Sequence, residues 1–269
     1  MIGVPITMRP RDVFTRLLVA IAVSTLVGCA TVPSEDRHPS DPFERYNRAV
    51  FTFNDGLDRA ILKPTAEAYS ELPQPVRTGV GNFFSNFDDV RVALNNVLQG
   101  KFHNAASDVS RVLFNTSFGL LGLIDVASPM GLAKNNEDFG QTLGYWGMPA
   151  GPYLQIPFLG PSTARDAPAR VVDFYTNPRN YTIGGRRELR DYWVPLALLD
   201  LVDTRAGLLS TEAALAALSD DRYVALRDLW LQRREFLVRD GEAADDDEWL
   251  DELDELEALE ALEREGSTQ

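Results

Sequence analysis

The stretch PVRTGVGNFFSNFDDVRVALNNVLQG, residues 75–100, decides the fold. Its apolar residues recur at intervals of three and four, the spacing that places side chains on one face of an α-helix. Pro75 is suited to the first turn of a helix and Gly100 to its end. The spacing therefore predicts one long amphipathic helix, whose apolar residues are Val76, Val80, Phe83, Phe84, Phe87, Val90, Leu94, Val97 and Leu98.

Helical spacing continues on both sides of this stretch. Before it, apolar residues recur from Phe43 to Leu57, and Lys63-Pro64 should end or kink that helix. After it come a helix from about His103 to Thr116 and, later, predicted helices around residues 192–202, 211–218 and 223–236. Successive amphipathic helices predict an all-α body.

The middle of the chain interrupts this pattern. Residues 118–124, FGLLGLI, are apolar but broken by glycine, and they are too few to span a bilayer as a helix. Residues 138–168 are rich in glycine, proline and aromatic residues, which favour turns and short pieces. The glycine-broken segment and the aromatic residues that follow it interrupt the helical pattern: Phe118, Gly119, Leu120, Leu121, Gly122, Leu123, Ile124, Tyr145, Trp146 and Tyr153.

The only cysteine, Cys29, follows a basic start and an eleven-residue apolar run, residues 17–27. This order is typical of a secretory signal. Leu26-Val27-Gly28-Cys29 also resembles the bacterial lipobox, which implies cleavage before Cys29 and lipidation of its side chain. Ala30 after the cysteine then favours the outer membrane. We expect residues 1–28 to be a signal peptide, residues 29–40 a polar tether and residues 41–239 the helical domain.

The charge is concentrated at the end of the chain. The net charge is −14, and residues 240–269 hold fourteen Asp or Glu and one Arg, which is −13. We expect this acidic tail to be flexible, since dense like charge opposes folding. No basic stripe is present that would bind nucleic acid.

Catalytic and metal-binding patterns are weak. His38 and His103 are the only histidines, and no Gly-x-Ser-x-Gly elbow accompanies them. One cysteine cannot form a disulfide within the chain or a multi-cysteine zinc site. We predict no enzyme activity, metal site or cofactor. Two alternatives stay open: a structural envelope lipoprotein without transport, and a lipid hydrolase that uses His103.

Together with the lipobox, four segments resemble the VacJ family, also called MlaA: DPFERYNRAVFTFNDGLDRAILKP, PQPVRTGVGNFFSNFDD, LFNTSFGLLGLIDVAS and EDFGQTLGYWGMPAGPYLQIPFLGPSTARDA. The resemblance covers about residues 29–240. It implies a ring-like bundle of amphipathic helices around a central amphipathic channel, embedded in the inner leaflet of the outer membrane and anchored by lipid on the periplasmic side. Non-helical backbone at membrane depth is tolerated only inside protein or beside a wet cavity. In such a bundle, the candidate channel or membrane-facing residues are Phe118, Gly119, Leu120, Leu121, Gly122, Leu123, Ile124, Tyr145, Trp146 and Tyr153. The resemblance further implies removal of mislocalised phospholipids from the outer leaflet, transfer to a soluble periplasmic carrier, and often a neighbouring trimeric porin.

Overall fold

The computed structural model describes residues 38–182, 190–212 and 221–241. The predictions for the signal peptide, Cys29, most of the tether, the 211–218 helix and most of the acidic tail lie outside these ranges. The described elements are α2 (Glu44–Leu57), a π-helix η2 (Asp58–Leu62), α3 (Lys63–Ser70), α4 (Gln74–Leu98), α5 (Phe102–Phe118), a 3₁₀ turn η3 (Ser128–Met130), α6 (Phe139–Tyr145), β1 (Tyr153–Ile156), β2 (Gly160–Thr163), α7 (Asp166–Thr176), α8 (Arg179–Thr182), α9 (Arg190–Gly207) and α11 (Arg222–Val238).

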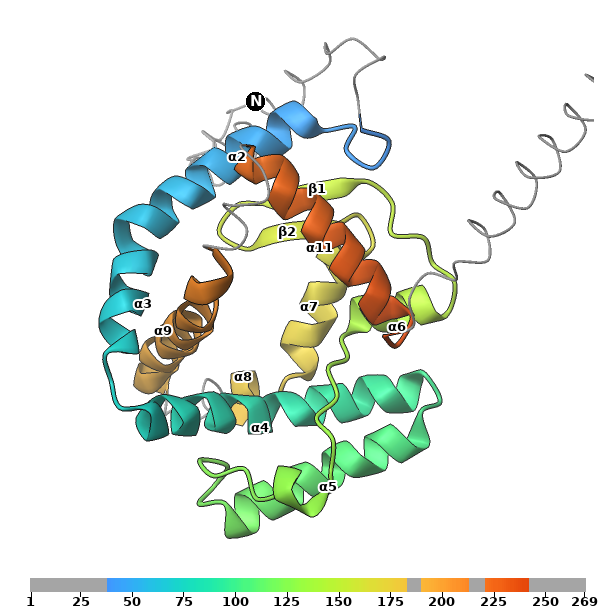
Figure 1. The fold of residues 1–269 in the computed structure, drawn as a ribbon. Coiled ribbons are helices and arrows are strands. Elements are labelled where there is room, and N and C mark those ends of the chain that lie inside the picture. Colours follow the sequence, from blue (N-terminus) through green and yellow to red (C-terminus); the bar gives the residue numbers. More distant parts are fainter. Residues whose placement is uncertain (1–37, 183–189, 213–220, 242–269) are drawn as a thin grey trace, which may run out of the picture.

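The chain is mostly helical, as the apolar spacing predicts, and its helices follow a ring (Figure 1). In that view α2, η2 and α3 form one side, α4 runs along the bottom with α5 below it, and α6 and α11 lie on the other side. The ribbons of α7 and α9 lie within this outline. No helix of the described residues is long and apolar enough to cross a membrane.

The predicted kink near Pro64 takes the form of a π-helix. Proline has no N–H to donate to the fourth residue before it, so a regular α-helical ladder cannot continue through Pro64. The five residues of η2 absorb the irregularity, and α3 follows with Pro64 in its first turn. The first helix therefore bends rather than ends, and it forms one curved side of the ring.

The contact between α4 and α5 is polar. Asn96 donates to Asp108 at 2.7 Å, Arg111 approaches Asp89 at 3.4 Å, and all four side chains are buried. Burial raises the pKa of both Asp89 and Asp108, although Lys134 and Asn135 respectively oppose this effect through hydrogen bonds. Among the described residues, more polar and charged residues than apolar ones are fully buried. The interior is thus held largely by hydrogen bonds.

A two-stranded antiparallel hairpin lies where the sequence predicts turns and short pieces. β1 pairs with β2 so that Tyr153 faces Thr163 and Ile156 faces Gly160. Asn47 of α2 holds the hairpin: its amide donates to the carbonyl oxygen of Tyr153 at 3.1 Å, and its Oδ1 accepts from the N–H of Gln155 at 2.7 Å. The hairpin is thereby fixed to α2.

Candidate functional site

Residues 118–124, here called the apolar loop, begin at the last residue of α5 and continue beyond it in a strained conformation. Leu120 and Leu121 have φ angles of 52° and 59°, and Gly122 follows at 93°. This left-handed region costs a non-glycine residue about 1–2 kcal/mol. Backbone hydrogen bonds hold the turn closed, including one from the N–H of Ile124 to the carbonyl oxygen of Gly119 at 2.8 Å.

Two glycines of the apolar loop allow a close approach of backbone and side chains. A Cβ atom on Gly119 would meet the carbonyl oxygens of Ile124 and Asn115. A Cβ atom on Gly122 would lie 2.8 Å from Nδ2 of Asn86. A side chain at either position would therefore clash with the surrounding atoms.

The strained turn displays its apolar side chains instead of burying them. The exposed fraction is 66% for Leu120 and 70% for Leu121, and Phe118, Leu123 and Ile124 are also exposed. Strain that brings no burial within the protein indicates that the side chains are held outward for contact with something else. The apolar loop thus has the properties expected of a membrane-facing or lipid-facing element.

A network of polar hydrogen bonds supports the apolar loop. Oδ1 of Asn115 accepts from the N–H groups of Val126 and Ala127 at 2.9 and 3.0 Å. Arg111 donates to Asp125 at 3.0 Å. Burial acts to raise the pKa of Asp125, but hydrogen bonds from Ser128 and Arg111 outweigh it and hold the pKa well below its usual range. The carboxylate of Asp125 in this network therefore stays ionised.

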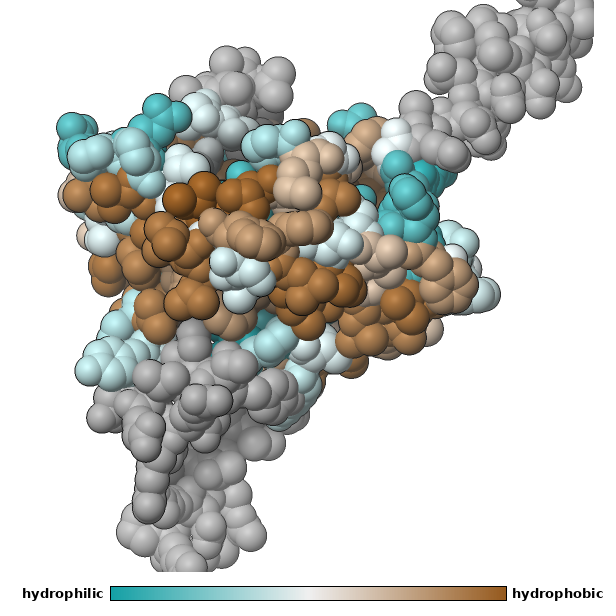
Figure 2. All heavy atoms as spheres, turned by 90° about the horizontal axis from the view of Figure 1, so that it is seen from below, coloured by the Kyte–Doolittle hydropathy of each residue, from teal (hydrophilic) through white to brown (hydrophobic). Residues whose placement is uncertain are grey.

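The outer sides of α4 and α5 continue the apolar surface. The stripe predicted on α4 faces outward at Val90, Leu94 and Val97, and α5 exposes a stripe of its own. We call these side chains the apolar face: Val90, Leu94, Val97, Leu98, Phe102, Val109 and Leu113. Figure 2, which views the molecule from below Figure 1, shows a broad band of apolar residues. Exposed apolar patches of this extent mark interaction sites.

The three aromatic candidates outside the apolar loop differ in their exposure. Trp146 is 69% exposed, and its indole N–H donates to the carbonyl oxygen of Leu98 at 3.0 Å. Tyr145 is half-exposed beside Lys101. Tyr153 is fully buried and donates to Gln155 at 2.8 Å, so it faces neither lipid nor a channel in this structure. It was predicted from composition, which does not distinguish an interfacial tyrosine from a core tyrosine.

A second surface, which the sequence analysis did not identify, lies on α7 and α9. Both helices expose large apolar side chains, among them Val171, Phe174, Tyr175, Leu198 and Leu201. The apolar residues of α7 could have indicated the α7 part of this second surface from the sequence. The proline inside α9 and the polar residues between its apolar ones obscure the rest.

Polar groups join α9, one of the two helices that carry this second surface, to its neighbours α8 and α3. Arg179 donates to Asp200 at 2.5 Å, and the hydroxyl of Tyr69 donates to Asp203 at 2.7 Å. Burial raises the pKa of Asp200, which Arg179 opposes and the neighbouring Asp88 and Asp203 reinforce. Charged groups and exposed apolar side chains therefore occur on the same helices, the combination that an amphipathic lipid requires.

His103 has no catalytic arrangement around it in the described part of the chain. It is exposed near the start of α5 and lines a groove with Ser107, Ser110 and Asn135. No hydrogen bond joins its ring to a serine or a carboxylate within the described ranges. Those ranges also contain no group of three or more His, Cys, Asp or Glu residues placed to hold a metal ion.

Comparison with known proteins gives consistent matches. A family model described as MlaA lipoprotein matches residues 39–237. The chain is 34% identical to the intermembrane phospholipid transport system lipoprotein MlaA of Escherichia coli, covering 83% of this chain and 88% of that protein. It is 33% identical to the protein of the same name from Haemophilus influenzae, over 90% and 96% of the two chains.

One solved structure resembles the fold. It comes from work on the structural basis for maintenance of bacterial outer membrane lipid asymmetry, and it is 33% identical in sequence with a TM-score of 0.60. The similarity covers 74% of this chain and 99% of that one.

Proposed function

The chain belongs to the MlaA lipoprotein family, and we propose that it removes mislocalised phospholipids from the outer leaflet of the outer membrane. It passes them to a soluble periplasmic carrier and so maintains lipid asymmetry. The observation that carries this proposal is the outward display of the apolar loop, with Leu120 and Leu121 exposed at the cost of backbone strain.

The energies support a lipid environment for this loop. Full burial of a leucine side chain contributes about 1.5–3 kcal/mol, which offsets the strain of about 1–2 kcal/mol at each left-handed leucine. The offset does not occur in water, where both side chains stay exposed. Contact with acyl chains supplies it, either at the bilayer or along the path of a lipid.

Transport requires no covalent chemistry. A phospholipid has a charged headgroup and two apolar tails, so its path needs polar groups beside an apolar wall. The exposed apolar side chains of α7 and α9, with Arg179 and Asp200 near them, fit a wall of that kind. We place the amphipathic passage along these helices, with diffusion down a gradient as the driving force.

The anchor and the partners complete the proposal. Acylation of Cys29 holds the domain on the periplasmic side of the outer membrane, since more than one acyl chain gives stable anchoring. A trimeric porin beside the apolar face is the expected membrane partner. Cys29→Ser should fail to incorporate palmitate and should lose outer-membrane localisation. Normal labelling of that variant contradicts the anchor.

The decisive test places a charge on the apolar loop. A charged side chain in hydrocarbon costs about 2.5–3.5 kcal/mol, so Leu121→Glu should let phospholipid accumulate in the outer leaflet at normal protein level. Leu121→Met, which keeps an apolar side chain, is the matched control and should behave as wild type. If Leu121→Glu keeps the outer leaflet clear, the placement of the lipid contact is wrong.

The two alternatives make different predictions. A structural lipoprotein carries no phospholipid through purification, whereas a transporter does. A hydrolase that uses His103 releases fatty acid from phospholipid, and His103→Ala abolishes that release. Mass spectrometry of lipids extracted from the purified protein separates the structural protein from the transporter, and an assay of fatty-acid release identifies the hydrolase.

A further inference from the structure

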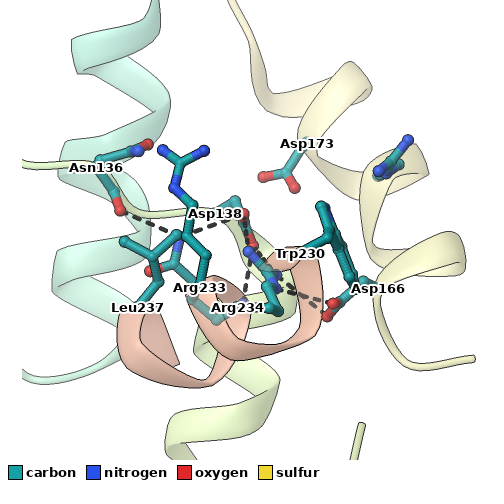
Figure 3. A pocket seen from close by; sticks show the side chains of 10 residues that line it. Asn136, Asp138, Asp166, Asp173, Trp230, Arg233, Arg234 and Leu237 are labelled. Carbon is teal, nitrogen blue, oxygen red and sulfur yellow. Dashed lines mark hydrogen bonds and ion pairs between the residues drawn. The ribbon is translucent and has the colours of Figure 1, made fainter. Parts of the chain in front are cut away.

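A polar cavity of about 230 Å³ lies between α6, α7 and α11 (Figure 3). Sites for drug-sized ligands measure about 300–1,000 Å³, so this cavity is too small for a lipid with its tails. It has room for a small polar group. Three carboxylates and three guanidinium groups line it: Asp138, Asp166, Asp173, Arg170, Arg233 and Arg234.

Part of this charge is already paired within the protein. Arg234 donates to both oxygens of Asp138 at 2.6 Å and to Asp166 at 2.8 Å, as the dashed lines of Figure 3 show. Arg170 is directed to backbone carbonyl oxygens of the hairpin turn, at Leu159 and Pro161. Gly140 leaves the space that Arg234 and Asp166 occupy. These groups form the wall of the cavity.

Arg233, in contrast, is not paired within the described part of the protein. It is exposed at the cavity, and within the described ranges no ion pair or hydrogen bond engages its guanidinium group. Figure 3 shows no interaction between Arg233 and Asp173, although both line the same space. One positive group therefore has free donors at the cavity.

Acceptors are available as well. Asp173 receives the N–H of Phe139 at 3.0 Å, but its contacts with Arg91 and Asn95 are long, at 3.5 Å each. Burial raises the pKa of Asp173, Arg91 opposes this and Asp138 adds to it, so its negative charge is incompletely compensated. Gln141 is 2% exposed and lines the cavity, and its Oε1 has no hydrogen-bond partner.

We propose that this cavity binds a zwitterionic phosphoethanolamine group, with the phosphate on Arg233 and the side-chain amide of Asn136, and the ammonium group on Asp173 and Oε1 of Gln141. This assignment rests on the proposed function, because it names the headgroup that the transporter selects. Guanidinium and phosphate form strong charge-assisted hydrogen bonds, and an ammonium group carries three donors for the acceptors opposite.

Simpler ions fit the cavity less well. A phosphate ion alone would face the carboxylates of Asp173 and Asp138, and a metal cation or an amine alone would face Arg233 and Arg170. A ligand that carries both charges satisfies both sides. Trp230 and Leu237 add apolar lining, which suits the carbon chain between the charged groups and the glycerol of a lipid.

The test compares headgroups bound by matched variants of the full-length protein. Wild type, Arg233→Gln and Arg239→Gln are purified from one membrane, and the ratio of ethanolamine to glycerol headgroups in their lipids is measured by mass spectrometry. Arg239 caps the end of the same helix but pairs with Glu235 outside the cavity. We expect enrichment of ethanolamine headgroups in wild type and Arg239→Gln, and a fall of about tenfold in Arg233→Gln.

A second measurement separates the possible sources of the group. Free phosphoethanolamine, inorganic phosphate and ethanolamine are titrated against wild type and Arg233→Gln by calorimetry. Binding of free phosphoethanolamine to wild type alone supports the site, and if ethanolamine lipid is not enriched as well, the ligand is the soluble compound. If inorganic phosphate binds to wild type as tightly as phosphoethanolamine does, the proposal of a zwitterionic ligand is wrong.

Failure of the headgroup site and failure of transport give different results. If wild type carries phospholipid at the membrane's own headgroup ratio and Arg233→Gln does not change it, the headgroup site is refuted while transport stands. If wild type carries no phospholipid, the transport proposal fails, and the titration with phosphoethanolamine alone then decides the cavity.

Discussion

The hydroxyl of Tyr223 donates a hydrogen bond to the carboxylate of Asp41, across 182 positions of the sequence. Asp41 is fully buried, and it also accepts from Asn47 at 2.7 Å and from Arg227 at 3.4 Å. The start of the domain is thereby fixed to its last described helix. The N-cap position of α2 is Phe43, so Asp41 does not cap this helix and makes the longer link instead.

Tyr223→Phe should destabilise the protein by about 1–3 kcal/mol, because it removes a donor from a buried carboxylate. The free energy of unfolding, measured by denaturant titration in mild detergent, tests this. Tyr175→Phe is the control, since Tyr175 is 61% exposed and its change should stay within about 0.5 kcal/mol. Equal effects of the two substitutions would show that the Asp41 link contributes nothing.

Gly122→Ala should be more destabilising than Gly131→Ala. Both glycines have left-handed backbone, with φ angles of 93° and 83°, so both substitutions incur similar strain. A Cβ atom on Gly122 meets Asn86, whereas nothing lies within 4 Å of one on Gly131. The difference between the two melting temperatures isolates the steric term. A difference of zero would mean that Asn86 moves aside without cost.

Leu121→Gly should raise stability in water while reducing function. Glycine adopts the left-handed region freely, so the substitution relieves about 1 kcal/mol of strain, and the leucine it removes is 70% exposed. Melting temperature and outer-leaflet phospholipid are measured on the same variant. A variant that is more stable and fully functional would remove the reason to regard this strain as functional.

The ionisation of Asp138 should make the free energy of unfolding depend on pH. Burial acts to raise its pKa, but the hydrogen bond and charge of Arg234 dominate and lower the pKa to about 2. The unfolded value is about 3.9, so the ionised form favours the folded state by about 2.5 kcal/mol above pH ~4. This contribution is lost as the pH falls towards 2. Asp138→Asn, which keeps an acceptor for the Gln141 N–H, should be less stable at pH 6 and indistinguishable near pH 2.

The helices could largely be predicted from the sequence. The stretch at residues 75–100 forms α4 at Gln74–Leu98, and the predicted 103–116 and 223–236 helices are confirmed as α5 and α11. Their spacing follows from helical geometry alone, which does not depend on what covers the apolar side. The hairpin was not predicted, because its four-residue strands are too short to show alternation.

The direction of the apolar faces could not be predicted. On α4 the predicted apolar face includes buried Phe84 but also exposed Val90 and Leu94, while Asn95 and Asn96 face inward. Periodicity locates an apolar stripe and does not say whether protein or lipid will cover it. The cavity at Arg233 was missed for another reason: its residues come from three segments far apart in the sequence.

The polar contact between α4 and α5 has a different role from the apolar side chains on the outer sides of these helices. Asn96 and Asp108, and Arg111 and Asp89, complete each other's contacts inside the protein, so this part of the structure needs no bilayer to assemble. Its outward leucines and valines are exposed and add no burial within the chain. Substitutions on the outer sides of these helices can therefore change what the surface binds without breaking the contacts that hold α4 to α5.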